Sequence, residues 1–277
     1  MSYGSEDVLP TFLRSIGHAA AINPLVVIVD NKATADSPVA TIAAEWGAEY
    51  LALPDNPGYG GALNAAVALL PASIDWVVLS NPDVVLGEAS IDLLVAAASS
   101  DTAIASVGPR VLTQDGETYP SARAIPSLRT GIGHAMFANL WPTNPWTRSY
   151  RSESDETNTS RDAGWLSGSC LVVRRAVFDQ IGGFDTDYFM YFEDVDLGYR
   201  LGRAGFRNVY VPSAVVTHAG AHSTSAESSR MIAAHHTSAQ RFIRQKYSTF
   251  LLWPVRTLIS GALSIRSRAL SRRAGHH

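Results

Sequence analysis

The stretch "DWVVLSNPDV", residues 75–84, joins a short β-branched run to a polar turn. Three further runs of this kind precede or follow it: "LVVIVD" (25–30), "EYLAL" (49–53) and "TAIASV" (102–107). Alanine-rich segments of helical length separate the runs, and this alternation indicates an α/β fold with a mostly parallel, Rossmann-like sheet and helices on both faces. Ligands bind such sheets at the carboxyl ends of strands, which here carry Asp30 and Asn81-Pro82-Asp83.

The composition limits which classes of protein this chain can belong to. With 277 residues, 46% of them hydrophobic, the chain can bury the core of one large domain, alone or with an appendage. A formal net charge of -3 argues against a nucleic-acid partner. The single cysteine, Cys170, cannot form an internal disulfide, and the N-terminus lacks a signal-peptide pattern, so we expect a cytoplasmic protein.

The second half of the chain is organised differently. Residues 120–161 combine prolines, aromatics and a polar stretch, which favours a lid or a partner surface. From Gly164 onward we expect, in order, the following elements: a strand at "CLVVRR", a short helix at "AVFDQI", a Gly182-Gly183 turn, an acidic helix, and strands at "NVYVP" and "AVVTH", the last ending at His218. A long helix should begin at Ser228.

Two parts of unequal size are therefore expected, a catalytic or binding domain over 1–225 and a C-terminal helix with a basic amphipathic tail over 226–277. After Arg241 the chain has seven basic residues and no acid, which indicates an anionic partner. The apolar run 250–265 contains Pro254 and Arg256 and is too short to span a bilayer, so the tail is expected to lie on a membrane surface.

Three acids follow an aromatic run in "YFMYFEDVDLGYR", residues 188–200. At about 100° per residue, Asp194 faces the body of the protein, whereas Asp196 is placed to pair with Arg200. Glu193 lies on the same side of the predicted helix as Arg200, and we expect it to add to the Asp196–Arg200 ion pair. A carboxylate at a helix N-terminus is stabilised as the anion, which suits Asp194 to act as a general base.

Other polar features have two interpretations each. "LSNPDV" is either a tight turn, since Asn-Pro and Pro-Asp are common turn dipeptides, or the place where Asp83 holds a divalent cation. "DNPGYGGALNAA", residues 55–66, is either a glycine-rich helix start needed for packing or a close approach to a phosphate. His218 is either a structural hydrogen-bonding residue or a ligand.

These pieces occur in one order: "VIVDN", "NPGYGGALN", "LSNPDV", "GWLSGSCLVVRR", "GGFDTDYFMYFEDVDLGYRLGRAG", and a strand ending in His. From Tyr3 to His218 the chain resembles glycosyltransferase family 2, inverting enzymes with the GT-A fold, and looks most like a rhamnosyltransferase branch of it. A closer resemblance, carried by "NPWTRSYR" (144–151) and the tail, is to actinobacterial enzymes that add L-rhamnose to a polyprenyl-diphosphate-linked N-acetylglucosamine.

The resemblance implies a role for each matching residue. Asp194 would be the catalytic base, and Asp83 and His218 would bind Mg²⁺ or Mn²⁺, with Asn81 replacing the first acid of the family's Asp-x-Asp motif. Donor-binding positions are Asp30, which would receive the pyrimidine N3–H, together with Asn56, Gly58, Asn81, Asp83 and Arg200. Acceptor-binding positions are Trp165, Gly168 and Glu193.

The function implied is transfer of L-rhamnose from dTDP-L-rhamnose to a hydroxyl of the lipid-linked acceptor, on the inner face of the cell membrane. Other nucleotide sugars, an inactive glycan-binding homologue and a homo-oligomer stay open. A nucleotidyltransferase would need a strongly basic phosphate-binding loop near the N-terminus, and none is visible.

One expectation concerns the start of the chain. In the family's pattern a hydrophobic strand precedes the segment that matches residues 2–16, and it lies between the strands at 25–29 and 76–79. Here only Met1 precedes Ser2. Without that strand, two neighbouring strand edges would face each other unpaired, so we expect the natural protein to begin with several more β-branched residues.

Overall fold

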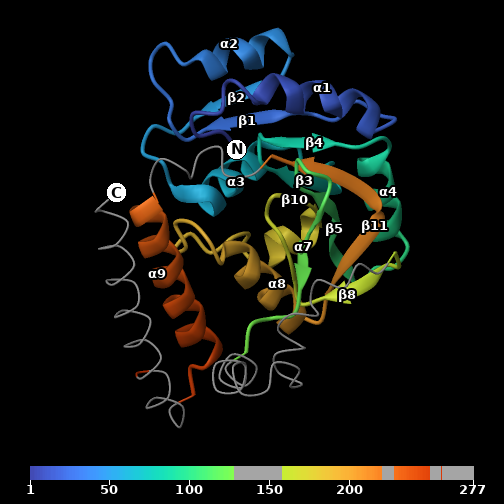
Figure 1. Ribbon diagram of the computed structural model, residues 1–277, viewed down its shortest axis with the longest axis vertical. Coiled ribbons are helices and arrows are strands. Elements are labelled where there is room, and N and C mark those ends of the chain that lie inside the picture. Colours follow the sequence, from blue (N-terminus) through green and yellow to red (C-terminus); the bar gives the residue numbers. More distant parts are fainter. Residues whose placement is uncertain (128–157, 220–227, 250–256, 258–277) are drawn as a thin grey trace.

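The computed structural model of the protein describes residues 1–127, 158–219, 228–249 and 257 (Figure 1). The expected alternation of strands and helices is confirmed over the first half of the chain. The strands are β1 (Val27–Asp30), β2 (Glu49–Ala52), β3 (Trp76–Ser80), β4 (Val84–Leu86), β5 (Ile104–Leu112), β6 (Thr118–Tyr119), β7 (Ala122–Arg123), β8 (Arg161–Ala163), β9 (Trp165–Leu166), β10 (Cys170–Arg174) and β11 (Arg207–His218). The helices are α1 (Leu9–Ala19), α2 (Pro38–Glu45), α3 (Gly58–Leu69), α4 (Ser90–Ser99), α7 (Arg175–Gln180), α8 (Glu193–Arg203) and α9 (Ser228–Lys246).

The central sheet is mixed, which corrects the expectation of a mostly parallel one. Its order is β3-β10-β5-β11-β4, and along this path only β5 and β11 run parallel. The reason is the path of the chain before β10. The pairing of β9 with β7 brings the chain to the edge where β3 ends, so β10 starts where its neighbour finishes and runs antiparallel to it.

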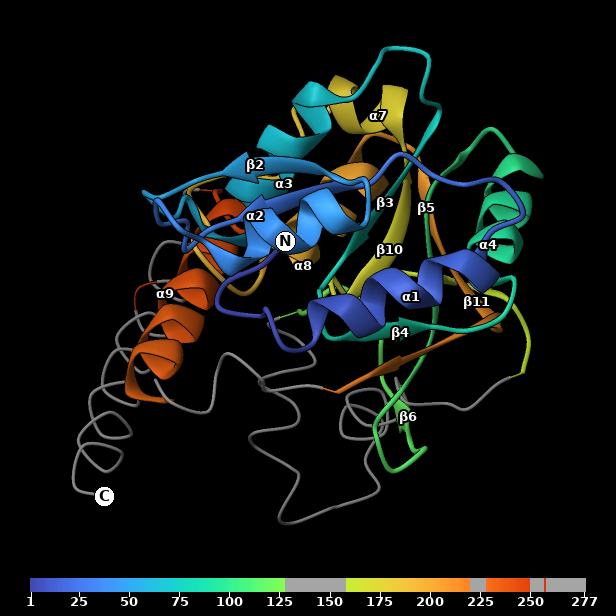
Figure 2. The ribbon, with the colours of Figure 1, turned by 90° about the horizontal axis from the view of Figure 1, so that it is seen from above.

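Side chains alternate between the two faces of β10, as the period of two requires. Leu171 and Val173 pack with α3, α7 and α8 on one face. Val172 packs with α4 on the other, and Cys170 packs there with α1. Both faces are therefore covered by helices, as expected, and the paired helix layers can be followed in Figure 2.

A second sheet is formed by β1 and β2 alone, which pair in parallel. Helix α1 packs Leu9 and Leu13 against it, and α3 packs Ala62 and Ala66 against its Val29, so these two helices join the small sheet to the large one. In the described residues β1 does not pair with β3. Between them, Ser2 makes a parallel bridge to Asp30, and the Met1 nitrogen donates to the carbonyl of Ser80 at 3.2 Å.

Strand β11 replaces the two strands expected at "NVYVP" and "AVVTH". It runs without a break through Pro212, and its register with β5 shifts between Val211 and Val215. A proline cannot donate to a ladder, and a bulge at this position lets the strand continue around it. The shift leaves the end of β11, at His218, opposite Val84 of β4.

The C-terminal helix expected from Ser228 is confirmed as α9, which lies beside α8 in Figure 1. The lid expected within 120–161 falls mostly on residues 128–157, and the amphipathic tail falls on 250–277. Apart from Thr257, both lie outside the described residues. In the part of the chain that is described, no helix is long and apolar enough to cross a membrane.

Gly58, the first residue of α3, provides a test of the fold. Its φ is +79°, and a Cβ built on it would lie 2.2 Å from the carbonyl oxygen of Phe189. Gly116 has nearly the same φ, +80°, but a Cβ there meets nothing within 4 Å. Gly116→Ala should lower the free energy of unfolding by about 1–2 kcal/mol, the cost of the left-handed conformation. Gly58→Ala should lower it by about 2–5 kcal/mol, because overpacking adds roughly 1–3 kcal/mol.

Urea denaturation of the two variants beside the parent chain measures both losses. Equal losses would mean that the close approach of α3 to Phe189 is not a constraint on the fold.

Candidate functional site

Most of the predicted site residues meet at one edge of the two sheets. The carboxyl ends of β1 and β3 bring Asp30, Asn81 and Asp83 there, and the N-termini of α3 and α8 bring Gly58 and Asp194. The short connection 167–169, between β9 and β10, contacts two of them: the N–H of Gly168 donates to Asp194, and the carbonyl of Ser169 accepts from the N–H of Asn81.

Gly168 holds Asp194 in place. Its backbone N–H donates to Asp194 Oδ2 at 3.0 Å, while Asp194 Oδ1 accepts from the N–H of Val195 at 2.8 Å. The carbonyl of Gly168 accepts a hydrogen bond from the hydroxyl of Tyr59 in α3. A Cβ on Gly168 would lie 3.3 Å from the Tyr59 ring, which is tight, and 3.6 Å from Asp194 Cβ, which is ordinary contact.

Asp194 has two opposing influences on its charge. Burial raises the pKa of its carboxyl above the usual value, and the three backbone N–H groups around it, from Gly168, Val195 and Asp194 itself, lower that pKa in part. The Arg123 guanidinium lowers it further. The result is a half-buried carboxylate with a raised proton affinity and a fixed direction, both of which a general base needs.

Glu193, immediately before Asp194, is only 7% exposed, and its Oε2 has no hydrogen-bond partner among the described residues. Burial and then the neighbouring Asp194 raise the pKa of the Glu193 carboxyl to about 8. Two adjacent buried carboxyls cannot both ionise at low cost. At neutral pH the pair therefore carries a single negative charge, which lies mainly on Asp194.

Asp83 and His218 lie together, with Asn81 beside them. His218 Nε2 is 3.1 Å from Asp83 Oδ1 and 3.3 Å from Asn81 Nδ2. The antiparallel pairing of His218 with Val84, the residue after Asp83, produces this contact. The side chains of Asp83 and His218 are 10% and 21% exposed, which leaves them accessible to a ligand.

This group has the donors that a divalent cation uses. A carboxylate, an imidazole and, after rotation of its amide, the Asn81 oxygen suit Mg²⁺ or Mn²⁺. Nε2 of His218 has either a proton or a lone pair. It can therefore donate to Asp83 or accept from the Asn81 amide nitrogen, and the other contact is then unfavourable. The described residues contain no cluster of three or more His, Cys, Asp or Glu, and a cation here would need the amide or ligands from the substrate.

Asp30 ends β1 and is almost fully buried. Its Oδ2 accepts from the hydroxyls of Ser37, at 2.6 Å, and Tyr50, at 3.1 Å, and its Oδ1 accepts from the N–H of Lys32 at 3.0 Å. Three donors fix the orientation of the carboxylate, and a fourth acceptor position is left for an N–H group such as that of a pyrimidine.

Asn56 and Gly58 form the turn that opens α3. Asn56 Oδ1 accepts from the Asn31 side chain at 3.1 Å and from the N–H of Gly58 at 3.2 Å. Asn31 also donates to the carbonyl of Gly58, and its own Oδ1 is buried without a partner among the described residues. Sequence reasoning missed Asn31 and Tyr59 as site residues. Their positions in the sequence could have indicated them, because Asn31 follows Asp30 and Tyr59 lies between Gly58 and Gly60.

Arg200 is a predicted donor-binding residue, but its printed hydrogen bonds go to other partners, and the donor-binding role stays a prediction. Its guanidinium bonds Asp196 at 2.6 Å and the carbonyls of Ile181 and Gly183 at 3.0 and 2.7 Å. The expected i,i+4 pair with Asp196 is confirmed, and it ties α8 to the Gly182-Gly183 turn. Glu193 does not join this pair in the described contacts, contrary to expectation.

Trp165 lies on β9, and its Nε1 donates to the carbonyl of Ala124 at 3.1 Å. The Arg123 guanidinium is 5.9 Å from its ring. A Cβ on Gly198 would lie 2.6 Å from Trp165 Cβ, so the missing side chain in α8 lets β9 approach the helix. The indole is thereby placed on the same side of α8 as Asp194.

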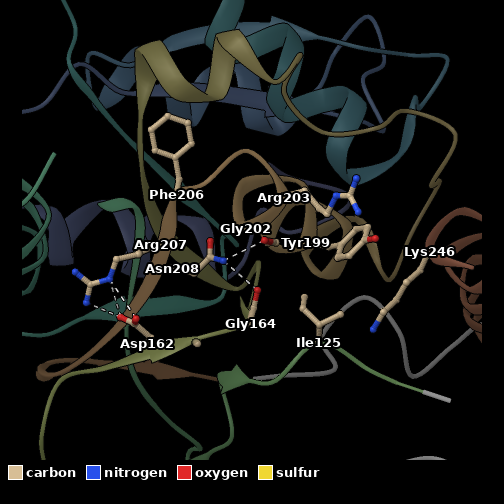
Figure 3. Close-up of a pocket in the computed structure, with 12 residues that line it drawn as sticks. Ile125, Asp162, Gly164, Tyr199, Gly202, Arg203, Phe206, Arg207, Asn208 and Lys246 are labelled. Carbon is tan, nitrogen blue, oxygen red and sulfur yellow. Dashed lines mark hydrogen bonds and ion pairs between the residues drawn. The ribbon is translucent and has the colours of Figure 1, made fainter. Parts of the chain in front are cut away.

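A separate hollow of about 360 Å³ lies beside the C-terminal half of α8 (Figure 3). Tyr199, Arg203 and Lys246 line one side of it, and Asp162 and Arg207 form an ion pair on the other. It contains none of the residues predicted for catalysis or metal binding.

Comparison with known proteins yields several matches. A family model described as "Glycosyltransferase like family 2" matches residues 1–237. The chain is 43% identical to the N-acetylglucosaminyl-diphospho-decaprenol L-rhamnosyltransferase of Mycobacterium tuberculosis (strain H37Rv), over 98% of this chain and 91% of the relative. It is 29% identical to rhamnosyltransferase WbbL of Escherichia coli (strain K12), over 89% of this chain and 91% of that protein.

Among solved structures, mannosyltransferase PcManGT from Pyrobaculum calidifontis, in complex with GDP-Man and Mn²⁺, is similar with a TM-score of 0.56. The match covers 99% of this chain and 73% of that chain at 15% identity. This likeness confirms the GT-A fold that the sequence predicted, with the mixed sheet described above.

The unusual state of Glu193 can be tested by stability measurements. The pKa of Glu193 is about 8 in the folded protein and 4.5 in the unfolded chain. As pH rises from 4.5 to 8, Glu193 therefore loses its proton in the unfolded chain but keeps it in the folded protein. The free energy of unfolding falls steadily across this pH range. Glu193→Gln should therefore be more stable than the parent, by a margin that is small near pH 4.5 and grows to a few kcal/mol near pH 8.

Urea midpoints measured across this pH range give the margin, with the exposed Glu117→Gln as the control, which should follow the parent chain. A margin that stays constant with pH would mean that Glu193 is ionised in the folded protein.

Proposed function

This chain belongs to glycosyltransferase family 2, and we propose that it is an inverting enzyme that transfers L-rhamnose from dTDP-L-rhamnose to an N-acetylglucosamine carried on a polyprenyl diphosphate. The observation that carries the proposal is the position of Asp194, which Gly168 holds at the same edge of the sheets that has Asp30, Asp83 and His218. The 43% identity to the mycobacterial enzyme over 98% of this chain supports the choice of sugar and acceptor.

Asp194 is assigned as the base. Its three backbone N–H groups take at most three of the four lone-pair positions of the carboxylate, so one remains to take the proton of the acceptor hydroxyl as that hydroxyl attacks the anomeric carbon. The attack comes from the face opposite the leaving nucleoside diphosphate, and the configuration inverts. Neutral Glu193 adds no second charge, and its Oε2, which has no partner among the described residues, would be available to contact the acceptor sugar.

The donor would lie along the edge formed by β1 and β3. Asp30 would accept the pyrimidine N3–H, and the Asn56–Gly58 turn would lie against the nucleoside. Asn81, Asp83 and His218 would hold a divalent cation beside the diphosphate. Such a cation offsets the charge that develops on the leaving diphosphate. Trp165 would stack on the acceptor sugar, and Arg123, beside it, lies where an acceptor phosphate could be bound.

The assignment of the reaction is tested by incubating the purified chain with dTDP-L-rhamnose and a short-chain polyprenyl-diphosphate N-acetylglucosamine, beside a panel of other nucleotide sugars. We expect rhamnosyl transfer with inverted anomeric configuration.

Asp194→Asn should reduce kcat by about 10²–10⁴-fold, the usual contribution of a general base, while donor affinity stays near that of the parent. Transfer from a different nucleotide sugar alone would replace rhamnose in the proposal, and near-normal turnover by Asp194→Asn would remove Asp194 from the mechanism.

The cation site has a readout that does not depend on turnover. Mn²⁺ titrations followed by electron paramagnetic resonance, with dTDP present, should show one site. His218→Ala should weaken it by more than about tenfold, since even loss of an outer-shell partner costs roughly 10–100-fold. His236→Ala, in α9, is the control and should bind as the parent does. Chelation should abolish transfer, and Mg²⁺ or Mn²⁺ should restore it. Unchanged Mn²⁺ binding by His218→Ala would separate this histidine from the metal.

The tail is proposed to hold the enzyme at the surface of an anionic membrane, on the cytoplasmic face where nucleotide sugars are found. Phe250, Leu251, Leu252 and Trp253 supply apolar side chains, and five arginines follow them, at 256, 266, 268, 272 and 273. Neither signal anchors a protein strongly alone, and their combination can. The segment over 226–277 would then comprise α9, which follows the catalytic domain over 1–225, and the membrane-associating tail after it.

Vesicle sedimentation tests the anchor. Deletion after Tyr247 should weaken binding to vesicles containing phosphatidylglycerol by about tenfold or more, at roughly 1 kcal/mol for each basic residue near the surface. A matched variant with the five tail arginines changed to glutamine keeps the apolar residues and isolates the electrostatic part. Binding that is the same with and without the tail would show that the tail packs elsewhere.

A further inference from the structure

The two residues before the Glu193–Asp194 pair have a strained backbone. Tyr191 and Phe192 have φ values of +66° and +67°, in the left-handed region that residues other than glycine rarely adopt. The carbonyl of Phe192 accepts the first backbone hydrogen bond of α8, from Asp196 N at 2.8 Å, so this turn sets the direction in which the helix starts. Strain of this kind persists only where the surroundings over-determine it.

Helix α9 supplies much of those surroundings. The His235 ring packs edge to face against both turn residues, with centroid distances of 5.6 Å to Tyr191 and 5.4 Å to Phe192. Phe242, which is 1% exposed, lies 5.8 Å from the Phe192 ring and packs with Val195, one residue beyond the base.

Hydrogen bonds from α9 reach the chain on both sides of the turn. Before it, Ser238 donates to the carbonyl of Met190 at 2.8 Å, and the hydroxyl of Tyr188 donates to Gln245 Oε1 at 3.0 Å. After it, Gln245 Nε2 donates to Asp196 Oδ1 at 2.9 Å. Tyr188 and Asp196 are fully buried, so a single amide group, that of Gln245, joins the two ends of the segment that carries the base.

We propose that α9 is a clamp on the catalytic base, in which Phe242 and Gln245 are positioning residues that hold the Tyr191–Phe192 turn and so aim Asp194 at Gly168 and the acceptor. This inference rests on the proposed function, since it concerns the base of that reaction. It extends the catalytic unit past residue 237, where the family match ends, and past the boundary at 225 expected from the sequence.

The clamp predicts which kinetic constant changes. Phe242 and Gln245 contact none of the residues assigned to the donor, so their loss should leave the KM for the donor unchanged and lower kcat. A loosened turn also admits water to Asp194. Because burial raises the pKa of that carboxyl, the acid limb of the kcat profile should then move to lower pH.

The experiment uses the full chain with Phe242→Ala and Gln245→Leu, and with Phe242→Leu as a conservative variant that keeps most of the packing. Leu94→Ala is the matched control, because Leu94 is equally buried but lies in α4 on the opposite face of the sheet. Each protein is measured for melting temperature, kcat, donor KM, the pH profile of kcat, and amide hydrogen exchange over residues 188–196.

We expect Phe242→Ala and Gln245→Leu to exchange faster over 188–196 and to lose about tenfold in kcat, with donor KM within about twofold and the acid limb at lower pH. Phe242→Leu should lose less, and Leu94→Ala should melt earlier with kcat and exchange over 188–196 unchanged. Unchanged exchange, or faster exchange with full kcat, overturns the clamp. If the parent chain shows no transfer from any donor, the proposed function fails, while the exchange measurements still decide whether α9 holds the turn.

Discussion

The site depends on the backbone of Gly168 and its neighbour. The N–H of Gly168 holds the Asp194 carboxylate, and its carbonyl accepts from Tyr59. The carbonyl of Ser169 accepts from the N–H of Asn81 at 2.9 Å. Two residues thus join β3, α3 and α8 at the edge where the ligands would lie. The joint is made of peptide groups, which cannot rotate away as side chains can, and glycine at its centre admits the close contact with Tyr59.

The charge at the base follows from its position in this joint. Asp194 lies at a helix N-terminus and accepts backbone N–H groups, so it keeps its negative charge despite burial. Glu193 is more deeply buried, at 7% exposed, and accepts fewer backbone N–H groups, so its pKa rises to about 8. Adjacent residues of nearly the same chemistry are thereby separated into a charged base and a neutral acid. A buried carboxyl with an unpartnered oxygen lowers stability, which is a common feature of sites built for binding rather than for packing.

Helix α9 offsets part of that instability. It covers the strained turn before Glu193 with aromatic rings and ties both sides of it through Gln245. Since the same helix leads toward the basic tail, the part of the chain proposed to meet the membrane and the part that orients the base are continuous. A glycosyltransferase whose acceptor is lipid-linked would gain from this continuity, because enzyme and acceptor then share one surface.

Local patterns were sufficient for much of the fold and for part of the site. The β-branched runs at β1, β3 and β10 and the i,i+4 spacing of Asp196 and Arg200 involve neighbours in sequence, so the order of strands and helices and that ion pair could be predicted. The resemblance of the acidic helix to family 2 pointed to Asp194 before any contact was known. Strand direction could not be read from β10 itself, because a hydrophobic strand looks alike in either direction and its neighbours are decided by where the chain turns back.

Tertiary structure alone decided the partners of the site residues. The contact between His218 and Asp83 requires β11 to shift register past Pro212, and the contact between Gln245 and Asp196 spans 49 residues. Arg200 also donates to the carbonyls of Ile181 and Gly183, two contacts that no spacing rule predicts. Sequence determined which side chains the protein has at the ends of its strands and helices. Packing determined which of them meet, because burial, pairing and strain depend on surfaces brought together from distant parts of the chain.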